Sequence, residues 1–291
     1  MPDMKRIHIV GCGPRSGTTL IAEMMVICFD IDLHTDHEAR LSKWPPRRAN
    51  IFLTKKPSDI LVVDPLLRIM PNLYVICMVR DPRDMIVSKH GIAPDRYWSN
   101  LNFWKIYTPH AFKLQSHPRF VTIRYEDLVT QPDQVQEELL KKIPFLVKRI
   151  PFSRYHELAH PSKRSLLALG EVRPISPSSI GNWRKHLPRV AGQLQIHGSI
   201  TEDLIAYGYE KDVTWEHVLD GVAPDINPSH WPESHAEAKQ RRHRRHIYVK
   251  TVMILLRNSW LLLTMRDALR AVSKKARRLF QNDFSGKKER G

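Results

Sequence analysis

The chain has 291 residues, of which 42% are hydrophobic, enough for one substantial core or two small ones. Its three cysteines (Cys12, Cys28 and Cys77) are an odd number, which argues against a disulfide framework and favours reduced thiols in a reducing compartment. Because the first apolar stretch has the pattern of a strand, we expect no cleaved signal peptide and a cytoplasmic location, with peripheral attachment to the inner face of a membrane as a further option.

The formal net charge of +16 is unevenly distributed. Residues 239–291 hold 16 Lys and Arg against 3 Asp and Glu, a net of +13, whereas residues 1–238 hold 30 and 27, a net of +3. We therefore expect a nearly neutral globular domain over 1–212, a proline-containing linker over 213–238 and a basic tail over 239–291.

Strand-like and helix-like segments alternate along the globular part. The pattern predicts strands at 6–10, 51–54, 72–79 and 119–125, and helices at 18–29, at 82–91 and within 132–142. The strand at 72–79 is a continuous apolar run, as expected of a strand covered on both faces. The alternation predicts an α/β protein: a P-loop-like three-layer fold with a central parallel sheet flanked by helices, followed by a basic helical tail.

The stretch GCGPRSGTT (11–19) joins the first strand to the first helix. A helix N-terminus offers unpaired N–H groups and a partial positive charge, which together favour an oxyanion. Gly13 and Gly17 let the backbone approach such a ligand, and the hydroxyls of Thr18 and Thr19 add donors. The alternative is an ordinary helix start capped by Ser16 or Thr18.

This turn departs from the P-loop of nucleotide triphosphatases. That pattern requires glycine at the position of Cys12 and lysine at the position of Thr18. The lysine of a P-loop serves the β- and γ-phosphates, and the hydroxyl after it holds magnesium. Here Arg15 is the basic residue, so we expect a different anion.

A second basic landmark follows the strand at 72–79. In MVRDPRDMIVS (78–88), Arg80 lies at the strand end and Ser88 lies eight residues later, on the expected helix. A guanidinium and a hydroxyl at one point suit a phosphate monoester. The alternative is a surface ion pair of Arg80 with Asp81 or Asp84.

These two motifs resemble those of the sulfotransferases that use 3′-phosphoadenosine-5′-phosphosulfate (PAPS). PRSGTTL (14–20) resembles their 5′-phosphosulfate loop in the arginine form of the tyrosylprotein and many bacterial members, and Arg80 with Ser88 resembles their 3′-phosphate site. The resemblance spans roughly residues 6–190. It implies PAPS as cosubstrate, with the following cofactor-binding residues in the first two motifs: Gly13, Arg15, Ser16, Gly17, Thr18, Thr19, Arg80 and Ser88.

Two later segments resemble less specific elements of the family. RYEDLV (124–129) resembles its Tyr-Glu-Asp stretch, which places Tyr125 beside the adenine. SSIGNWRKHLP (178–188) resembles the segment that closes over the cofactor, with Gly181, Trp183 and Arg184 matching. The Arg-Lys-Gly triplet of the cytosolic members is absent just upstream, where this chain has ISPSS.

Transfer of a sulfuryl group requires cations near the departing phosphate oxygen and a base for the acceptor hydroxyl. Arg15 is the first cation, and TKKP (54–57) resembles the family's Lys-x-Pro element, which implies Lys55 as the second, with Lys56 as the alternative. HEAR (37–40) resembles the Glu-x-Arg segment of the tyrosylprotein enzymes, which implies Glu38 as the catalytic base. The other base candidates are His34, Asp36 and His37. We see no metal-binding cluster and expect no metal.

The tail contains no uncharged run long enough to span a membrane, because Lys250 and Arg257 interrupt it. Val249, Val252, Met253, Leu256, Trp260 and Leu263 have helical spacing and would form an apolar stripe. A basic amphipathic helix of this kind suits an anionic membrane surface, but docking on the globular domain and binding of a polyanionic acceptor stay open.

The leading hypothesis is a PAPS-dependent O-sulfotransferase that acts on a glycan or glycoconjugate hydroxyl. A tyrosyl acceptor is second and a small alcohol third. The rival readings are a P-loop-type kinase and a non-catalytic protein that binds a polyanion or a membrane. Nucleic acid is not an expected partner.

Overall fold

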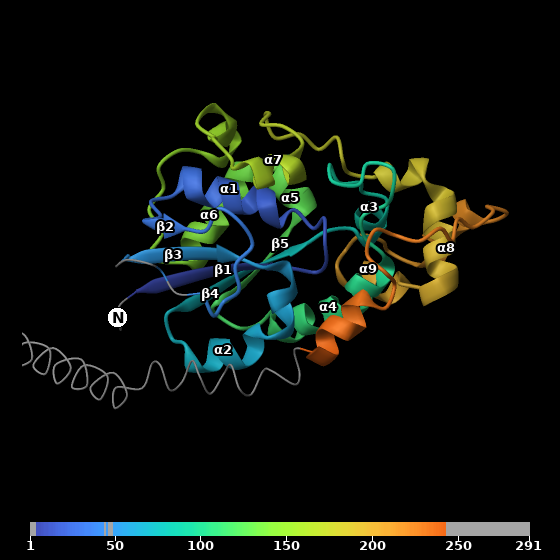
Figure 1. Ribbon diagram of the computed structural model, residues 1–291, viewed down its shortest axis with the longest axis horizontal. Helices are drawn as coiled ribbons and strands as arrows, with labels where there is room; N and C mark the ends of the chain where they lie inside the picture. The colour runs from blue at the N-terminus through green and yellow to red at the C-terminus, as the bar shows by residue number, and fades with distance from the viewer. Residues whose placement is uncertain (1–3, 44, 46–48, 243–291) are drawn as a thin grey trace, which may run out of the picture. The chain divides into compact units, whose positions relative to one another are not determined.

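The computed structural model describes residues 4–43, 45 and 49–242. Within them, five parallel strands form one sheet in the order β2-β3-β1-β4-β5 (Figure 1). The strands are β1 (Lys5–Gly11), β2 (Leu33–His34), β3 (Ile51–Lys55), β4 (Leu73–Val79) and β5 (Phe120–Arg124). The four longer strands lie within one residue of their predicted bounds at each end, whereas the two-residue β2 was not predicted.

Helices cover both faces of the sheet, which confirms the predicted three-layer α/β fold. In Figure 1, α1, α5, α6 and α7 lie above the strands, and α2 and α4 lie below them. The α-helices are α1 (Thr18–Cys28), α2 (Val63–Ile69), α3 (Pro82–Ile86), α4 (Leu101–Leu114), α5 (Tyr125–Thr130), α6 (Pro132–Lys142), α7 (Lys163–Leu169), α8 (Leu187–His197) and α9 (Thr201–Ala206). The 3-10 helices are η1 (Pro57–Leu61), η2 (Phe152–Glu157), η3 (Asn182–Lys185) and η4 (Val213–Leu219).

The core lies between the central strands and α1. Ile7 and Ile9 of β1 and Ile76 of β4 are fully buried, and they pack with Met24 and Met25 of α1. These strands are apolar on both faces because helices cover both, as the sequence pattern predicts. The three cysteines are buried and free.

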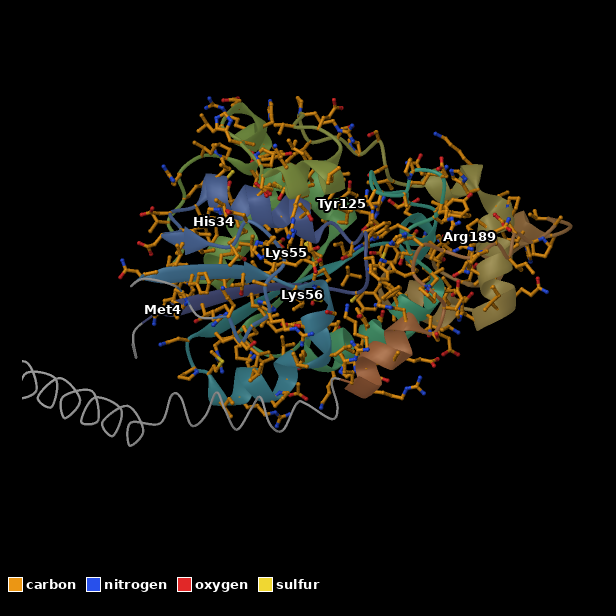
Figure 2. All side chains as sticks on the ribbon, viewed as in Figure 1. Met4, His34, Lys55, Lys56, Tyr125 and Arg189 are labelled. Atoms are coloured by element: carbon orange, nitrogen blue, oxygen red, sulfur yellow. The ribbon has the colours of Figure 1, made fainter. Side chains whose placement is uncertain are left out.

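The direction of the chain connections changes at β1. After β1 the chain forms β2 and β3 on one side of it, and then β4 and β5 on the other side. In parallel sheets, such a switch point opens a crevice beyond the carboxyl ends of the strands. The 11–19 turn after β1, Lys55 at the end of β3, Arg80 after β4 and Tyr125 after β5 all lie at this edge. Of these residues, Figure 2 labels Lys55 and Tyr125.

The helix predicted over 82–91 was wrong in length, because α3 ends at Ile86. Proline occupies its first turn, and the side chain of Asp81 accepts the Arg83 N–H, as expected of a helix start. The carbonyl of Ser88, however, accepts a hydrogen bond of 3.0 Å from the Trp98 N–H, a contact with a distant part of the chain. Ser88 therefore lies in a loop beyond the helix.

Residues 213–238 contact other parts of the described chain. Arg189 of α8 is buried and donates to the Asn227 carbonyl at 2.8 Å and to the Ser229 hydroxyl at 2.5 Å (Figure 2). The carbonyl of Tyr97 accepts the His230 N–H at 2.8 Å. These contacts connect the 227–230 stretch to α8 and to Tyr97.

Most of the expected basic tail, including the apolar stripe from Val249 to Leu263, lies outside the described residues. Across the part of the chain that is described, none of the helices combines the length and apolarity needed to cross a membrane.

Candidate functional site

The 11–19 turn has an unusual backbone. Gly13, Arg15 and Gly17 have φ values of 131°, 67° and 89°. A Cβ on Gly17 would lie 2.6 Å from Cδ2 of Tyr125, so glycine is required there by both space and conformation. Arg15 is the one non-glycine residue with positive φ in the described chain, and such strain at a non-glycine residue marks candidate functional positions.

The guanidinium of Arg15 spans two distant segments. Its Nε donates to the Ser88 hydroxyl at 2.9 Å, and its Nη1 donates to the Ala168 carbonyl at 2.9 Å. Burial, and then the nearby charge of Arg80, lowers the pKa of Arg15 to about 10, so the group stays a cation at neutral pH. The structure thus brings Arg15 and Ser88 directly together.

Arg80 lies beside Arg15 and is only 7% exposed. It donates to the Arg15 carbonyl at 3.1 Å and to the Ser179 carbonyl at 3.0 Å. Its guanidinium lies over the Tyr125 ring, 4.4 Å from the centroid, and the Tyr125 hydroxyl is 2.7 Å from that of Ser179. Arg80 therefore lies beside Tyr125, and Arg15 links Arg80 to Ser88.

Neither Arg15 nor Arg80 forms an ion pair with a carboxylate in the described part of the chain. The alternative of a surface pair for Arg80 was wrong. Asp81 instead pairs with Arg83 at 2.7 Å, and the carboxylate of Asp84 accepts two backbone N–H groups. Two adjacent cations that are bonded only to neutral oxygens favour binding of an anion.

A cavity of about 470 Å³ opens beside these cations. Seven residues that were predicted to bind the cofactor line it: Arg15, Gly17, Thr18, Thr19, Arg80, Ser88 and Tyr125. Asn182, which lies between the predicted Gly181 and Trp183, lines it as well. Lys89, Arg173 and His186 also line it and were not predicted. Gly13 and Ser16 do not line it; Ser16 is fully buried and donates its hydroxyl to the Gly13 carbonyl, so it stabilises the turn.

The 178–188 segment is attached to α3 through hydrogen bonds to Asp84. Its carboxylate accepts the N–H groups of Gly181 at 2.7 Å and of Trp183 at 2.9 Å. Burial raises the pKa of Asp84, and the Trp183 N–H is the largest opposing influence. Trp183 is 2% exposed and stacks on Arg83, 4.2 Å from its ring centroid. Gly181, Trp183 and Arg184 do not line the cavity; they hold Ser179 and Asn182 at its wall.

Lys55 reaches the turn from the end of β3. Its ammonium donates to the Thr19 hydroxyl at 2.8 Å, and burial lowers its pKa. Lys56 points elsewhere and forms an ion pair of 2.5 Å with Glu38. Of the two lysines, Lys55 is therefore the one that contacts the 11–19 turn.

A second cavity, of about 270 Å³, shares Arg15, Thr18, Thr19 and Ala168 with the first. Its other walls are formed by Pro14, Glu38, Lys56, Pro57, Ser58, His90, Trp98, Phe103, Tyr107, Trp231, His235 and Lys239. Arg15 and Thr19 thus lie on both cavities. This arrangement suits two ligands that meet beside Arg15.

The four predicted base candidates separate in the structure. Glu38 lines the second cavity, but His34, Asp36 and His37 do not. His34 and Asp36 pair with each other at 3.6 Å on the surface. Sequence reasoning missed His90 and His235, which line the cavity because distant segments fold onto it.

No group of three or more His, Cys, Asp or Glu side chains in residues 4–43, 45 and 49–242 is arranged to hold a metal ion.

Comparison with known sequences identifies a sulfotransferase family whose model matches residues 33–144. This match includes Glu38, Lys55, Arg80, Ser88 and Tyr125, but not the 11–19 turn. None of the curated proteins matches the chain.

Several solved structures are similar, and three of them are described below. The sulfotransferase domain of the Synechococcus PCC 7002 olefin synthase has 15% identity and a TM-score of 0.40, over 62% of this chain and 88% of that chain. Sulfotransferase STF9 from Mycobacterium avium has 14% identity and a TM-score of 0.26, over 60% and 43%. Retinol dehydratase in complex with androsterone and inactive cofactor PAP has 14% identity and a TM-score of 0.28, over 89% and 82%.

We predict that Asp84→Ala releases the 178–188 segment from α3. Hydrogen bonds to charged groups contribute about 1.5–3 kcal/mol each, and Asp84 accepts two from backbone donors. Amide hydrogen exchange measured by mass spectrometry should become at least about 10-fold faster for the peptide that covers residues 179–184. The exposed Asp95→Ala variant is the control. Unchanged protection of this peptide in Asp84→Ala would contradict the anchoring role.

Proposed function

We propose that this chain, which belongs to the sulfotransferase family, transfers a sulfuryl group from PAPS to the hydroxyl group of an acceptor. The observation that carries the proposal is the pair of guanidinium groups, Arg15 and Arg80, which share one cavity and, within the described residues, donate hydrogen bonds only to neutral oxygens. PAPS supplies anionic groups that such a pair can bind.

The lining of the first cavity supports one orientation of PAPS. The 11–19 turn, with the Thr18 and Thr19 hydroxyls, suits the 5′-phosphosulfate, because backbone donors and a helix N-terminus meet there. Arg80 and Ser88 suit the 3′-phosphate, and the Tyr125 ring suits the adenine. Ser88 also bonds Arg15, so the two phosphate sites are directly coupled.

The chemistry then depends on fixed cations. When the sulfur–oxygen bond to the nucleotide breaks, negative charge develops on the departing phosphate oxygen. Arg15 lies in the turn that would hold this oxygen, and Lys55 reaches the same turn through Thr19. Preorganised donors of this kind lower the barrier because they need no rearrangement during the reaction.

The alternative function, a P-loop-type kinase, would need a lysine that this chain lacks in the 11–19 turn. Thr18 occupies the position of the P-loop lysine, and Lys55 approaches from a different strand. A decayed, non-catalytic site is also disfavoured, because Arg15, Lys55, Arg80 and Ser88 are all present and gathered at one edge.

We further propose a glycan or glycoconjugate as the acceptor. The second cavity has Trp98 and Trp231 in its walls, and such rings offer flat surfaces for a sugar ring. A tyrosine side chain would also pack against these rings. Transfer of radiolabelled sulfate to oligosaccharides but not to tyrosine peptides supports the glycan; the reverse result favours the tyrosyl alternative.

We predict that the protein binds adenosine 3′,5′-bisphosphate at least about 100-fold more tightly than adenosine 5′-phosphate in calorimetry. The 3′-phosphate adds charge-assisted hydrogen bonds to Arg80 and Ser88, and each 1.4 kcal/mol changes affinity tenfold. Arg80→Met should remove most of the difference, whereas the exposed Arg149→Met should preserve it. Equal affinities in the unmodified chain, or a preference for ATP with magnesium, would favour the kinase.

We predict that Arg15→Ala and Lys55→Ala each lower kcat by about 100-fold or more, because each removes a cation from the departing oxygen. Thermal unfolding should show that both variants fold, and Lys141→Ala, at an exposed position, should retain full activity. Turnover should persist in EDTA. An enzyme that needs a metal and is indifferent to both substitutions would contradict this account.

For the basic tail, we propose peripheral binding to anionic membranes, on the basis of its +13 net charge. We predict that the full chain sediments with anionic vesicles at low salt and less at high salt, because salt screens the attraction. Replacing Lys274, Lys275, Arg277 and Arg278 by glutamine should weaken sedimentation, since each cation near the surface contributes about 1 kcal/mol. Equal sedimentation of both chains would refute this.

A further inference from the structure

The second cavity contains three side chains with the chemistry of a general base: Glu38, His90 and His235. All three share the cavity with Arg15 and Thr19, where the proposed sulfuryl transfer would occur. A proton must leave the acceptor hydroxyl during the transfer. The hydrogen bonds of the three side chains distinguish them.

The carboxylate of Glu38 is already engaged. Its Oε2 lies 2.5 Å from the ammonium of Lys56, and the Glu38 side chain is 47% exposed. The ammonium competes with a substrate hydroxyl for this oxygen. As the proton acceptor, Glu38 would have to act from within an ion pair on the outer side of the cavity.

The imidazole of His90 is oriented as a donor. Its Nδ1 accepts the Ile92 N–H at 3.1 Å, so the neutral ring carries its proton on Nε2. The ring stacks on Trp98 at 4.2 Å between centroids, with an interplanar angle of 22°. In this position, His90 can donate to a ligand but has no free nitrogen lone pair with which to take a proton.

We propose that His235 is the base that accepts the proton of the acceptor hydroxyl in the function proposed above. Its ring lies against Trp231, 4.5 Å between centroids, and against Phe103 at 5.8 Å. Neither ring nitrogen has a hydrogen-bond partner within residues 4–43, 45 and 49–242. A lone pair is therefore available on a ring that aromatic neighbours hold in place.

The segment that carries His235 is firmly attached. The Asn100 amide donates to the Trp231 carbonyl at 2.9 Å, and the Asn102 amide donates to the Glu233 carbonyl at 2.6 Å. The His235 N–H donates to the Pro232 carbonyl, and Ala236 is fully buried. These contacts fix the backbone on both sides of the imidazole.

Burial and the nearby cations favour the neutral form of the His235 imidazole. Burial, followed by the charges of Lys239 and Arg242, lowers its pKa below the ordinary value. Lys56 and Glu38 line the same cavity and face it as an ion pair. The ring therefore loses its proton at a lower pH than an exposed histidine, and it gains one only as the pH falls below that pKa.

In the proposed step, the acceptor oxygen forms a bond to sulfur while its proton passes to an imidazole nitrogen of His235. The bond between sulfur and the bridging oxygen of PAPS breaks, and its electron pair stays on the 5′-phosphate. The products are the sulfated acceptor, adenosine 3′,5′-bisphosphate and an imidazolium, which returns the proton to water.

The test compares His235→Gln with the full unmodified chain, using radiolabelled PAPS with an oligosaccharide, a tyrosine peptide and 4-nitrophenol as acceptors. Transfer to the oligosaccharide should fall by about 10²–10⁴-fold. Transfer to 4-nitrophenol should fall far less, because this acceptor ionises near neutral pH without help. The decrease of kcat/KM at acid pH in the unmodified chain should disappear in the variant.

His230→Gln, in the same segment but outside the cavity walls, is the matched control. Its kcat/KM should still decrease at acid pH. Unchanged affinity of His235→Gln for adenosine 3′,5′-bisphosphate establishes that the variant folds. If the decrease of kcat/KM at acid pH disappears in Glu38→Gln or His90→Gln but persists in His235→Gln, this inference alone is overturned. Absence of transfer to every acceptor by the unmodified chain overturns the proposed function and, with it, this inference.

Discussion

The site is organised by two adjacent cations, Arg15 and Arg80, whose hydrogen bonds in the described part of the chain go only to neutral oxygens. Arg80 donates to the backbone carbonyl of Arg15, while the Arg15 side chain donates to Ser88 and Ala168. Buried charges are costly without compensation, and neutral oxygens compensate two guanidinium groups only in part. The arrangement is therefore one that an anionic ligand stabilises. It also explains the strained backbone at Arg15, because these bonds restrain the residue from several sides.

The same arginine separates the two cavities. The larger cavity contains the residues suited to a nucleotide bisphosphate, and the smaller contains aromatic rings and ionisable side chains. A group transferred between ligands in the two cavities would pass beside Arg15 and Thr19. The 228–242 segment completes the smaller cavity by supplying Trp231, His235 and Lys239. The specificity of the acceptor would thus depend on a part of the chain beyond the family match at 33–144.

Local sequence patterns were sufficient for the four longer strands of the sheet and for the position of the 11–19 turn. The apolar runs of β1 and β4 and the glycines of the 11–19 turn have strong local preferences, so their positions were predicted closely. The length of α3 was not, since its end depends on a hydrogen bond between Ser88 and the distant Trp98. The contacts of the 213–238 segment with Arg189 have no local signal in the sequence, because they are tertiary contacts. His235 was missed for the same reason.

In the proposed function, Arg15 and Arg80 together bind the two phosphate groups of one nucleotide. A crystal structure of the full chain with adenosine 3′,5′-bisphosphate would show whether they do. We expect the 5′-phosphate at the backbone donors of the 11–19 turn and the 3′-phosphate against Arg80 and Ser88. A nucleotide bound elsewhere, or one whose phosphates contact neither arginine, would contradict the account.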